Sequence, residues 1–244
     1  MLLEALFSLS RAPPQPDEFM PTDHVRFSPV SDTEPADMQS DSGREPFILL
    51  PAEEQARARF YGLLATLLLS PPSAGLLDAL ATADPIDGAT GKLAPAWEQL
   101  VLVAGIMDAE AVREEFDALF VSTGTPLINP HASLYLSGFM MDRPLAALRS
   151  TLRELGVARQ ADASELEDHL GSLCEAMALL IQQGRPLRMQ KAFFNEHIAG
   201  WVQACLADMR NAHGARFYLH VARVLDAFVE LEREAFEIGD CAGV

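Results

Sequence analysis

Hydrophobic residues recur at helical spacing from residue 52 to near the end of the chain. Large apolar side chains stand three and four positions apart, which places them on one face of a helix at about 100° per residue. Prolines and glycines separate these periodic segments and mark where one helix ends and the next begins. The helices that this pattern predicts span residues 52–70, 76–83, 96–107, 109–120, 131–141, 144–155, 164–184, 185–212 and 217–236.

The pattern does not predict strands. No segment alternates β-branched and polar residues between turn residues, and the sequence shows no repeat with a fixed period. Amphipathic helices bury their apolar faces by packing against one another. We therefore expect an all-α fold, with a single helical-bundle domain over residues 52–238.

The first 51 residues differ from the rest in composition. They contain eight of the sixteen prolines and nine acidic residues against three basic ones. Such a segment buries too little apolar surface to offset the entropy lost on ordering, so we expect an extension that is mostly disordered. Residues 1–9 are an exception, because their leucines and phenylalanine suit one or two amphipathic helical turns.

The segment that begins at Ser164 is the most informative part of the helical region. Ser164 and Glu167 have the spacing of a capping box, in which each side chain accepts a hydrogen bond from a backbone N–H at the helix start. An apolar stripe follows, with His169 at its edge and polar residues on the opposite side. We expect this helix to expose a row of polar side chains, formed by Asp168, Ser172 and Glu175.

Charge narrows the range of partners. The formal net charge is −17, from 35 acidic and 18 basic residues. Phosphate backbones are bound by clustered lysine and arginine, so we expect no nucleic-acid partner. An acidic surface attracts basic peptides, although an acidic surface with no particular partner is also common. With 49% hydrophobic residues, the chain can bury a substantial core.

Several features favour a reducing, cytoplasmic location. Cys174 and Cys205 lie in apolar helical patterns, and no Cys-x-x-Cys pair occurs, so we interpret them as reduced core residues. No apolar run approaches the roughly 18–20 residues that cross a bilayer, so we expect no membrane insertion. The first residues lack a basic region, and the chain has no Arg-Arg pair, so neither a secretory nor a twin-arginine leader is predicted.

Motifs of common enzyme classes are absent from the sequence. There is no His-Glu-x-x-His, Walker or dinucleotide-binding motif, no Gly-x-Ser-x-Gly, and no histidine with glutamate three residues before it. We therefore expect neither a catalytic metal nor a cofactor, and no enzyme activity. Asp168 and His169 remain candidates for acid–base chemistry, but neighbours on a helix point about 100° apart. A rim histidine beside a solvated carboxylate is the simpler interpretation.

Four segments stand out in order along the chain: Asn129–Gly138 with Pro144-Leu145, Glu165-Leu166-Glu167-Asp168-His169 with Glu175 and Met177, Phe193–His197 with Trp201, and Phe217-Tyr218 with Leu225–Phe228. Together these segments resemble the TorD/DmsD family of cytoplasmic chaperones for molybdenum-containing redox enzymes. The resemblance extends over residues 53–236 and excludes the proline-rich extension. One position departs from the family pattern, since Leu166 stands where the family motif Glu-Pro-x-Asp-His has proline.

The resemblance implies a specific role. Such chaperones bind the catalytic subunit of a molybdenum enzyme, often through its twin-arginine signal peptide, and hold it until the cofactor is inserted. Some members are associated with guanine nucleotide near the Asp-His motif. By position, Glu165, Asp168 and His169 are the motif residues, and Tyr135 is a weaker candidate that could equally be a core residue. We expect Asp168 and Glu175 to meet the arginines, beside an apolar groove lined near Leu173 and Tyr135.

Two other functions stay open at this point. One is a helical protein that binds or hydrolyses a nucleotide through Asp168 and His169, although no basic or glycine-rich phosphate cradle lies near that motif. The other is an acidic adaptor for some other amphipathic helix. The sequence does not identify the client enzyme. It also leaves open a monomer or a homodimer, because helical hairpins with proline-containing loops can exchange between protomers.

Overall fold

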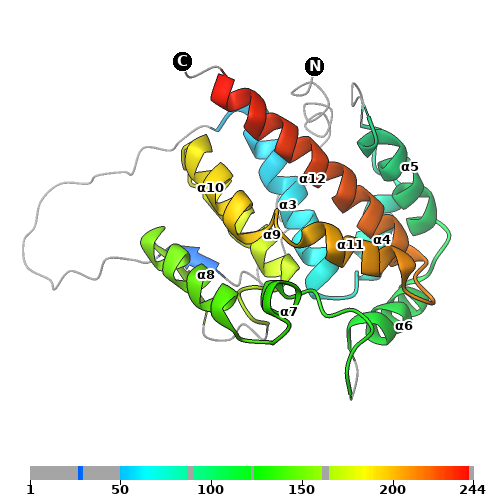
Figure 1. Ribbon diagram of the computed structural model, residues 1–244. Helices are drawn as coiled ribbons and strands as arrows, with labels where there is room; N and C mark the ends of the chain where they lie inside the picture. The colour runs from blue at the N-terminus through cyan, green and yellow to red at the C-terminus, as the bar shows by residue number, and fades with distance from the viewer. Residues whose placement is uncertain (1–26, 30–49, 87–90, 122–123, 161–164, 242–244) are drawn as a thin grey trace, which may run out of the picture.

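In this computed structural model, the structure describes residues 27–29, 50–86, 91–121, 124–160 and 165–241. The all-α prediction is confirmed: helices dominate the described residues, and only two three-residue strands accompany them. Figure 1 shows the helices as one bundle crossed by the long last helix. The helices are α3 (Ala52–Leu69), α4 (Ala74–Ala81), α5 (Leu93–Ala104), α6 (Ala109–Phe120), α7 (Ala132–Ser137), α8 (Arg143–Glu154), α9 (Leu170–Gln182), α10 (Leu187–His197), α11 (Val202–Asn211) and α12 (Phe217–Cys241).

Two helices, α3 and α9, form the centre of the bundle and pack against each other. Ten of the thirteen residues of α9 are buried, including Leu173, Cys174 and Met177. A helix that is apolar on nearly every side needs neighbours all round, and these come from α3, α10 and the strand β1. Burial raises the pKa of the Cys174 thiol and raises that of Cys205 to about 12. Both cysteines are free and buried, as the sequence predicts.

The long helix α12 begins at a carboxylate supplied by a distant helix. Glu115 of α6 accepts hydrogen bonds from the backbone N–H groups of Arg216, Phe217 and Tyr218 at 2.8, 3.0 and 2.8 Å. The first N–H groups of a helix lack partners within the helix, and the helix dipole favours a negative charge there. Glu115 therefore fixes the start of α12 against α6.

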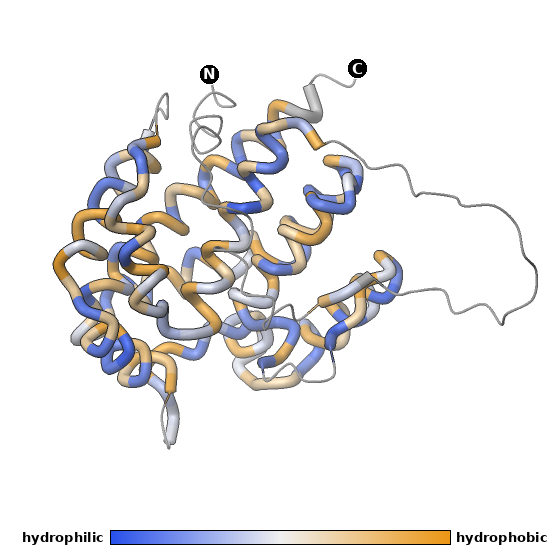
Figure 2. The backbone as a smooth tube through the Cα atoms, turned by 180° about the vertical axis from the view of Figure 1, so that it is seen from behind, coloured by the Kyte–Doolittle hydropathy of each residue, from blue (hydrophilic) through white to orange (hydrophobic). Residues whose placement is uncertain are grey.

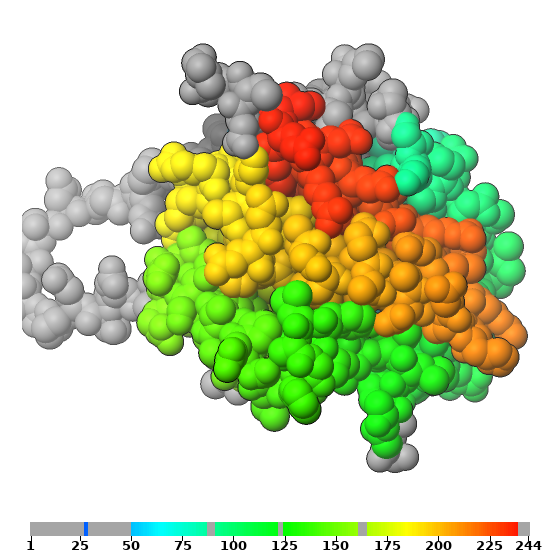
Figure 3. Space-filling model, viewed as in Figure 1, coloured from blue at the N-terminus to red at the C-terminus, as the bar shows by residue number. Residues whose placement is uncertain are grey.

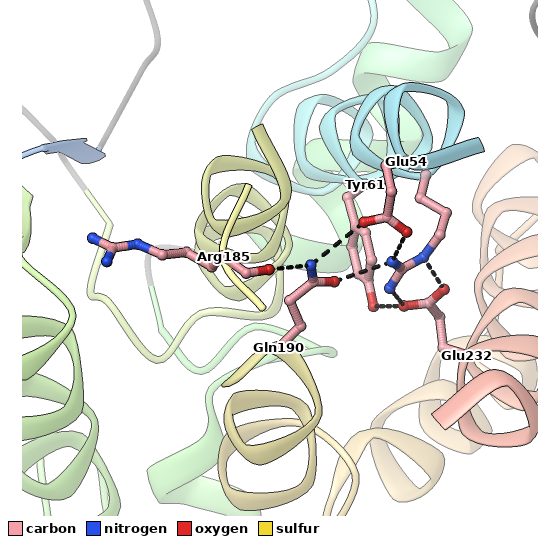
Figure 4. Close-up of polar contacts among 6 residues, drawn as sticks. Glu54, Tyr61, Arg185, Gln190 and Glu232 are labelled. Atoms are coloured by element: carbon pink, nitrogen blue, oxygen red, sulfur yellow. Dashed lines mark hydrogen bonds and ion pairs between the residues drawn. The ribbon is translucent and has the colours of Figure 1, made fainter. Parts of the chain in front are cut away.

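A buried ionic network joins α3, α10 and α12 (Figure 4). The Arg57 guanidinium donates to both Glu232 carboxylate oxygens, at 2.8 and 2.7 Å, and the Tyr61 hydroxyl donates to one of them at 2.9 Å. Arg57 also donates to Glu54 at 2.7 Å and to Gln190 at 3.0 Å. Burial opposes the charged form of Arg57, but the hydrogen bonds and charge of Glu232 outweigh it and raise the arginine pKa.

The prediction of no strands is wrong at one place. Residues Phe27–Pro29 (β1) pair antiparallel with Val157–Arg159 (β2), with Phe27 opposite Arg159. Phe27 is 2% exposed and belongs to the core, so the described part of the proline-rich extension contributes this side chain to the core. Three-residue strands are too short to produce a detectable alternation, and the pairing partner lies 130 residues away. The rest of the predicted extension lies outside the described residues.

Several predicted helix boundaries also change: the helix expected at 131–141 ends at Ser137, and the helix expected at 217–236 continues to Cys241. Two further changes have a clear local cause. The expected helix 185–212 is divided into α10 and α11 by the turn at residues 198–201. Gly200 has low helix propensity, and the Trp201 indole N–H donates to the backbone carbonyl of His197 at 2.7 Å. The helix α5 begins at Leu93, before Pro95, because proline is tolerated in the first turn where backbone N–H groups need no helical partner.

Among the described residues, none of the helices combines the length and hydrophobicity required to cross a lipid bilayer.

Candidate functional site

The Asp-His segment lies at a junction between two backbone segments, and the predicted helix start at Ser164 is wrong. Helix α9 begins at Leu170, with His169 as its N-cap. His169 forms an antiparallel β-bridge with His131, in which Leu170 N–H donates to the Pro130 carbonyl at 2.8 Å and Ala132 N–H to the Asp168 carbonyl at 2.9 Å. These bonds occupy the backbone groups that a helix through this segment would need. Ser164 itself lies outside the described residues.

The first turn of α9 is unusually close to the end of α3. His169 Nδ1 accepts a hydrogen bond from the backbone N–H of Gly171 at 3.0 Å, which caps the helix. A Cβ at Gly171 would lie 2.5 Å from Cγ of Leu69. Glycine is therefore required for the two helices to approach, and the hydrogen bond from its N–H holds the His169 ring.

Asp168 is buried, which corrects its predicted position on a solvent-facing row. Its side chain is 0% exposed, and one carboxylate oxygen accepts hydrogen bonds from the backbone N–H of Ser133, at 2.9 Å, and from the Ser133 hydroxyl. Ser133 is the second residue of α7, so a carboxylate 35 positions later in the chain caps that helix. Ser172, predicted on the same row, is also buried at 1% exposure. Asp168 thus holds α7 against the start of α9.

His131 lies between this buried carboxylate and the surface. Its ring is 5.0 Å from the ring of His169, edge to face, and its Nδ1 contacts the side-chain oxygen of Asn129. Its Nε2 lies 3.8 Å from the carboxylate of Glu165, whose side chain is 39% exposed. Burial lowers the pKa of His131 below its ordinary value, and the charges of Asp168 and Glu165 oppose that shift only in part. Because its side chain is partly exposed and that of Asp168 is buried, Glu165 is the residue of the Asp-His motif whose carboxylate solvent reaches.

The remaining predicted site residues lie deeper than expected. Leu173 is 0% exposed at the centre of the core, so it does not line an open groove in this structure. Glu175 is partly buried on α9. Glu167, which the sequence assigned to a capping box, accepts hydrogen bonds from Arg149 of α8 at 3.0 and 2.9 Å. Burial favours the protonated carboxyl of Glu167, but these bonds outweigh it and lower its pKa.

Tyr135 connects α7 with α11. Its ring stacks on that of Trp201 at 5.4 Å, and its hydroxyl donates to Asp208, which is exposed, at 2.8 Å. Partial burial, together with the Cys205 and Asp208 side chains, raises the pKa of the Tyr135 phenol. Figure 3 shows the surface of α7 directly beside that of α11 on this face of the molecule. The tyrosine is therefore partly a packing residue and partly a surface group.

Exposed hydrophobic residues concentrate beside this junction. Nine large hydrophobic side chains are exposed among the described residues, and five of them lie between positions 121 and 141. Leu136, Phe139 and Met141 are 48%, 72% and 70% exposed, and together we call them the apolar strip. Met141 has φ 58°, which is uncommon for a non-glycine residue and occurs often at functional sites. Leu136 lies on α7, the helix that Asp168 caps, and Phe139 and Met141 lie in the turn after it. The buried carboxylate therefore positions an exposed apolar surface.

The comparisons with known proteins identify the family. The model of the family described as nitrate reductase delta subunit matches residues 86–207, which is half of the chain. The chain belongs to the TorD/DmsD family. Over 213 residues it is 28% identical to the chaperone protein TorD of Shewanella loihica, which covers 78% of this chain and 98% of that protein.

Other TorD/DmsD relatives are similar over shorter spans. The chaperone protein TorD of Actinobacillus pleuropneumoniae is 24% identical over 174 residues, covering 71% of this chain and 78% of the relative. A protein of Haemophilus influenzae named as a probable Tat proofreading chaperone DmsD is 28% identical over 113 residues, covering 46% of this chain and 55% of the relative. The family resemblance read from the sequence is confirmed.

A solved structure supports the fold. It is a protein of Archaeoglobus fulgidus described as a candidate redox enzyme maturation protein, with a TM-score of 0.51 and 17% identity. The match covers 77% of this chain and 99% of that one. At this identity the likeness concerns the fold alone, which agrees with the all-α assignment.

Sequence reasoning found the Asp-His motif but missed the residues around it. His131 and Ser133 lie within the segment Asn129–Gly138 that suggested the family, yet no spacing rule links them to a motif more than thirty residues later. Phe139 stands at helical spacing after Tyr135, yet it is exposed, because periodicity does not distinguish an apolar face that meets the core from one that meets a partner.

The nucleotide-hydrolase alternative gains no support from this geometry. Asp168 would need to reach a phosphate-bound metal or an attacking water, but it is fully buried and bonded to Ser133. Among the described residues, no group of three or more His, Cys, Asp or Glu side chains is arranged to hold a metal ion.

Proposed function

We propose that this chaperone works in the cytoplasm and binds the catalytic subunit of a molybdenum redox enzyme through its twin-arginine signal peptide, before the cofactor is inserted. A signal peptide offers paired arginines followed by an apolar stretch. An acceptor therefore needs accessible carboxylates next to an exposed apolar surface. The observation that most supports the proposal is the apolar strip on and after α7, the helix whose start meets the His131–His169 junction, with Glu165 beside His131 and Asp208 beside Tyr135 of α7.

The carboxylates proposed for arginine binding are those that solvent reaches. Glu165 lies next to His131, and Asp208 lies beside Tyr135 on the neighbouring helix. Both are accessible, whereas Asp168 is fully buried. This revises the role expected for Asp168 from direct contact to positioning: it holds α7, and α7 presents Leu136 and the turn after it.

The apolar strip is proposed to receive the hydrophobic part of the signal peptide. Fully burying a large apolar side chain contributes about 1.5–3 kcal/mol. Since Phe139 and Met141 are each about 70% exposed, a peptide can cover most of both side chains. Exposed ion pairs contribute less, about 0.2–1 kcal/mol each. We therefore assign most of the affinity to the strip and the selection for arginine to Glu165 and Asp208.

The client is tested by affinity purification of the tagged full-length chain from its native cells. We expect the catalytic subunit of a molybdenum enzyme to co-purify, and to be lost when its signal peptide is deleted. Purification of a client that has no molybdenum cofactor would contradict the proposal. Recovery of the molybdenum-enzyme subunit irrespective of its leader would retain the chaperone role and exclude the signal peptide as the bound segment.

Titration calorimetry with the leader peptide of the recovered subunit tests the residues. Phe139→Ser is expected to weaken binding about tenfold or more, since about 1.4 kcal/mol corresponds to a factor of ten. Ile238→Ser is the matched control, because Ile238 is 59% exposed on α12, away from this site. Glu165→Gln combined with Asp208→Asn is expected to reduce the preference for an Arg-Arg leader over a Gln-Gln leader. Equal affinity of Phe139→Ser and Ile238→Ser would refute the assignment of the strip.

A further inference from the structure

An apolar groove lies at the edge of the bundle, between α4 and α5, on elements separate from the His131–His169 junction. Its volume is about 410 Å³, and its walls include Ala81, Pro85, Trp97, Val101 and Leu102. In Figures 1 and 2, which view the molecule from opposite sides, α5 lies at the periphery of the fold. The groove is therefore open to an occupant without any rearrangement of the core.

The chemistry of the groove suits a hydrophobic helix. Among the wall residues that the structure describes, Glu98 is the only charged one. Two large side chains on its walls are exposed, Leu102 at 57% and Ile106 at 71%. Ile106 is more exposed than Leu136. Large apolar side chains that are exposed together around a groove often mark a surface that another segment or protein covers. Recognition of an amphipathic helix by an apolar groove needs these features: an apolar floor, large apolar rims and few charges.

We propose that the occupant is the chain's own N-terminal segment, residues 1–9. This segment contains Leu2, Leu3, Leu6 and Phe7, which share one face when the segment is helical, and Glu4 is its only charged side chain. Alone, nine residues are too few for a stable helix in water, so the segment folds as it docks. The groove buries that apolar face, and the side of the helix that bears Glu4 faces solvent.

The length of the intervening chain permits this docking. Seventeen residues separate Leu9 from Phe27, which is anchored in β1. Fully extended, they span about 55–60 Å. A folded domain of this size has a diameter of about 40 Å, so the segment reaches the groove. A flexible linker of this length gives an effective concentration in the millimolar range, so a weak contact is sufficient.

Charge favours this occupant over a second copy of the protein. Each chain has a formal net charge of −17, so two copies repel each other at low ionic strength. Docking within one chain adds no such repulsion. The segment therefore covers the α4–α5 groove in the free chaperone, at a surface that the proposed client site does not use.

Hydrogen exchange of the full-length protein, followed by mass spectrometry, tests the proposal. Backbone amides at residues 101–107 bond within α5 and its last turn. We expect them to exchange several-fold more slowly in the wild type than in the Leu6→Glu, Phe7→Glu double variant. Ile106→Ser should give the same faster exchange, and the matched variant Ile238→Ser should leave exchange at residues 101–107 unchanged.

Protein concentration separates the alternatives. Protection that is constant from micromolar to tens of micromolar protein, with a monomer by sedimentation, supports docking within the chain. Protection that increases with concentration together with dimer formation would overturn the proposal in favour of a second copy. Identical exchange in the wild type and the Leu6→Glu, Phe7→Glu variant would also overturn the proposal, because the N-terminal segment would then not protect the groove. That result is the one expected if the groove serves a client helix instead. None of these outcomes depends on the client-binding proposal.

Discussion

Replacing Asp168 by alanine should destabilise the fold, because the carboxylate acts as a buried tether between α7 and α9. The replacement removes two hydrogen bonds, from the Ser133 backbone N–H and hydroxyl, and Ser133 is 0% exposed. Hydrogen bonds to a charged group contribute about 1.5–3 kcal/mol each. The other oxygen of Asp168 has no hydrogen-bond partner in the described part of the chain, so relief of its burial offsets part of the loss. We expect a net loss of about 3 kcal/mol.

Urea denaturation and thermal unfolding measure this loss. For a domain of this size, about 3 kcal/mol lowers the melting temperature by roughly 6–12 °C. Asp168→Asn keeps an acceptor oxygen and should cost about half as much. Ser133→Ala should cost about 1–2 kcal/mol, and the double variant should cost less than the sum of the two single variants, because both remove the same contact.

The contrast with Glu165 makes the test specific. Glu165→Ala changes an accessible side chain, so its unfolding free energy should stay within about 0.5 kcal/mol of the wild type. Its effect should appear in leader-peptide affinity instead. If Asp168→Ala unfolds at the same urea concentration as the wild type, Asp168 is not a structural tether and its proposed positioning role is refuted.

Two further predictions concern buried charges and pH. Glu232→Gln removes the main counter-ion of the buried Arg57 and should lower the unfolding free energy, measured by urea denaturation, by about 3 kcal/mol. The double variant Arg57→Met, Glu232→Leu should recover much of that loss, because it leaves no unpaired buried charge. A Glu232→Gln variant as stable as the wild type would contradict this prediction. Burial lowers the pKa of His197, whose Nε2 contacts Thr151, so its folded form resists protonation, and stability should fall as the pH decreases below about 6.5. His197→Gln should make the decrease of stability with falling pH shallower. His131, whose pKa is also lowered, should account for part of the pH dependence that the variant retains. If the pH dependence of the unfolding free energy is unchanged in His197→Gln, His197 does not contribute to it.

Local rules were sufficient for most helices. The segment 109–120 begins and ends where its periodicity predicts, and in the structure the Asp108 side chain caps it by accepting a hydrogen bond from the Ala111 backbone N–H. Errors occurred where distant parts of the chain compete for the same backbone groups. The expected helix start at Ser164 moved to Leu170 because Pro130 and Ala132 supply the hydrogen bonds of an alternative pairing. Nothing between residues 164 and 170 could reveal a partner that precedes it by more than thirty positions.

The sequence alone determined the fold class, the reduced state assigned to Cys174 and Cys205, and the family, because helical periodicity and motif order are local properties of the chain. Only the tertiary structure decided which motif carboxylate is accessible. Asp168 and Glu165 are three positions apart and chemically alike, yet one is fully buried against Ser133 and the other reaches solvent. Burial depends on what packs over a residue, and for Asp168 that covering is α7, whose position is fixed by bonds across the fold.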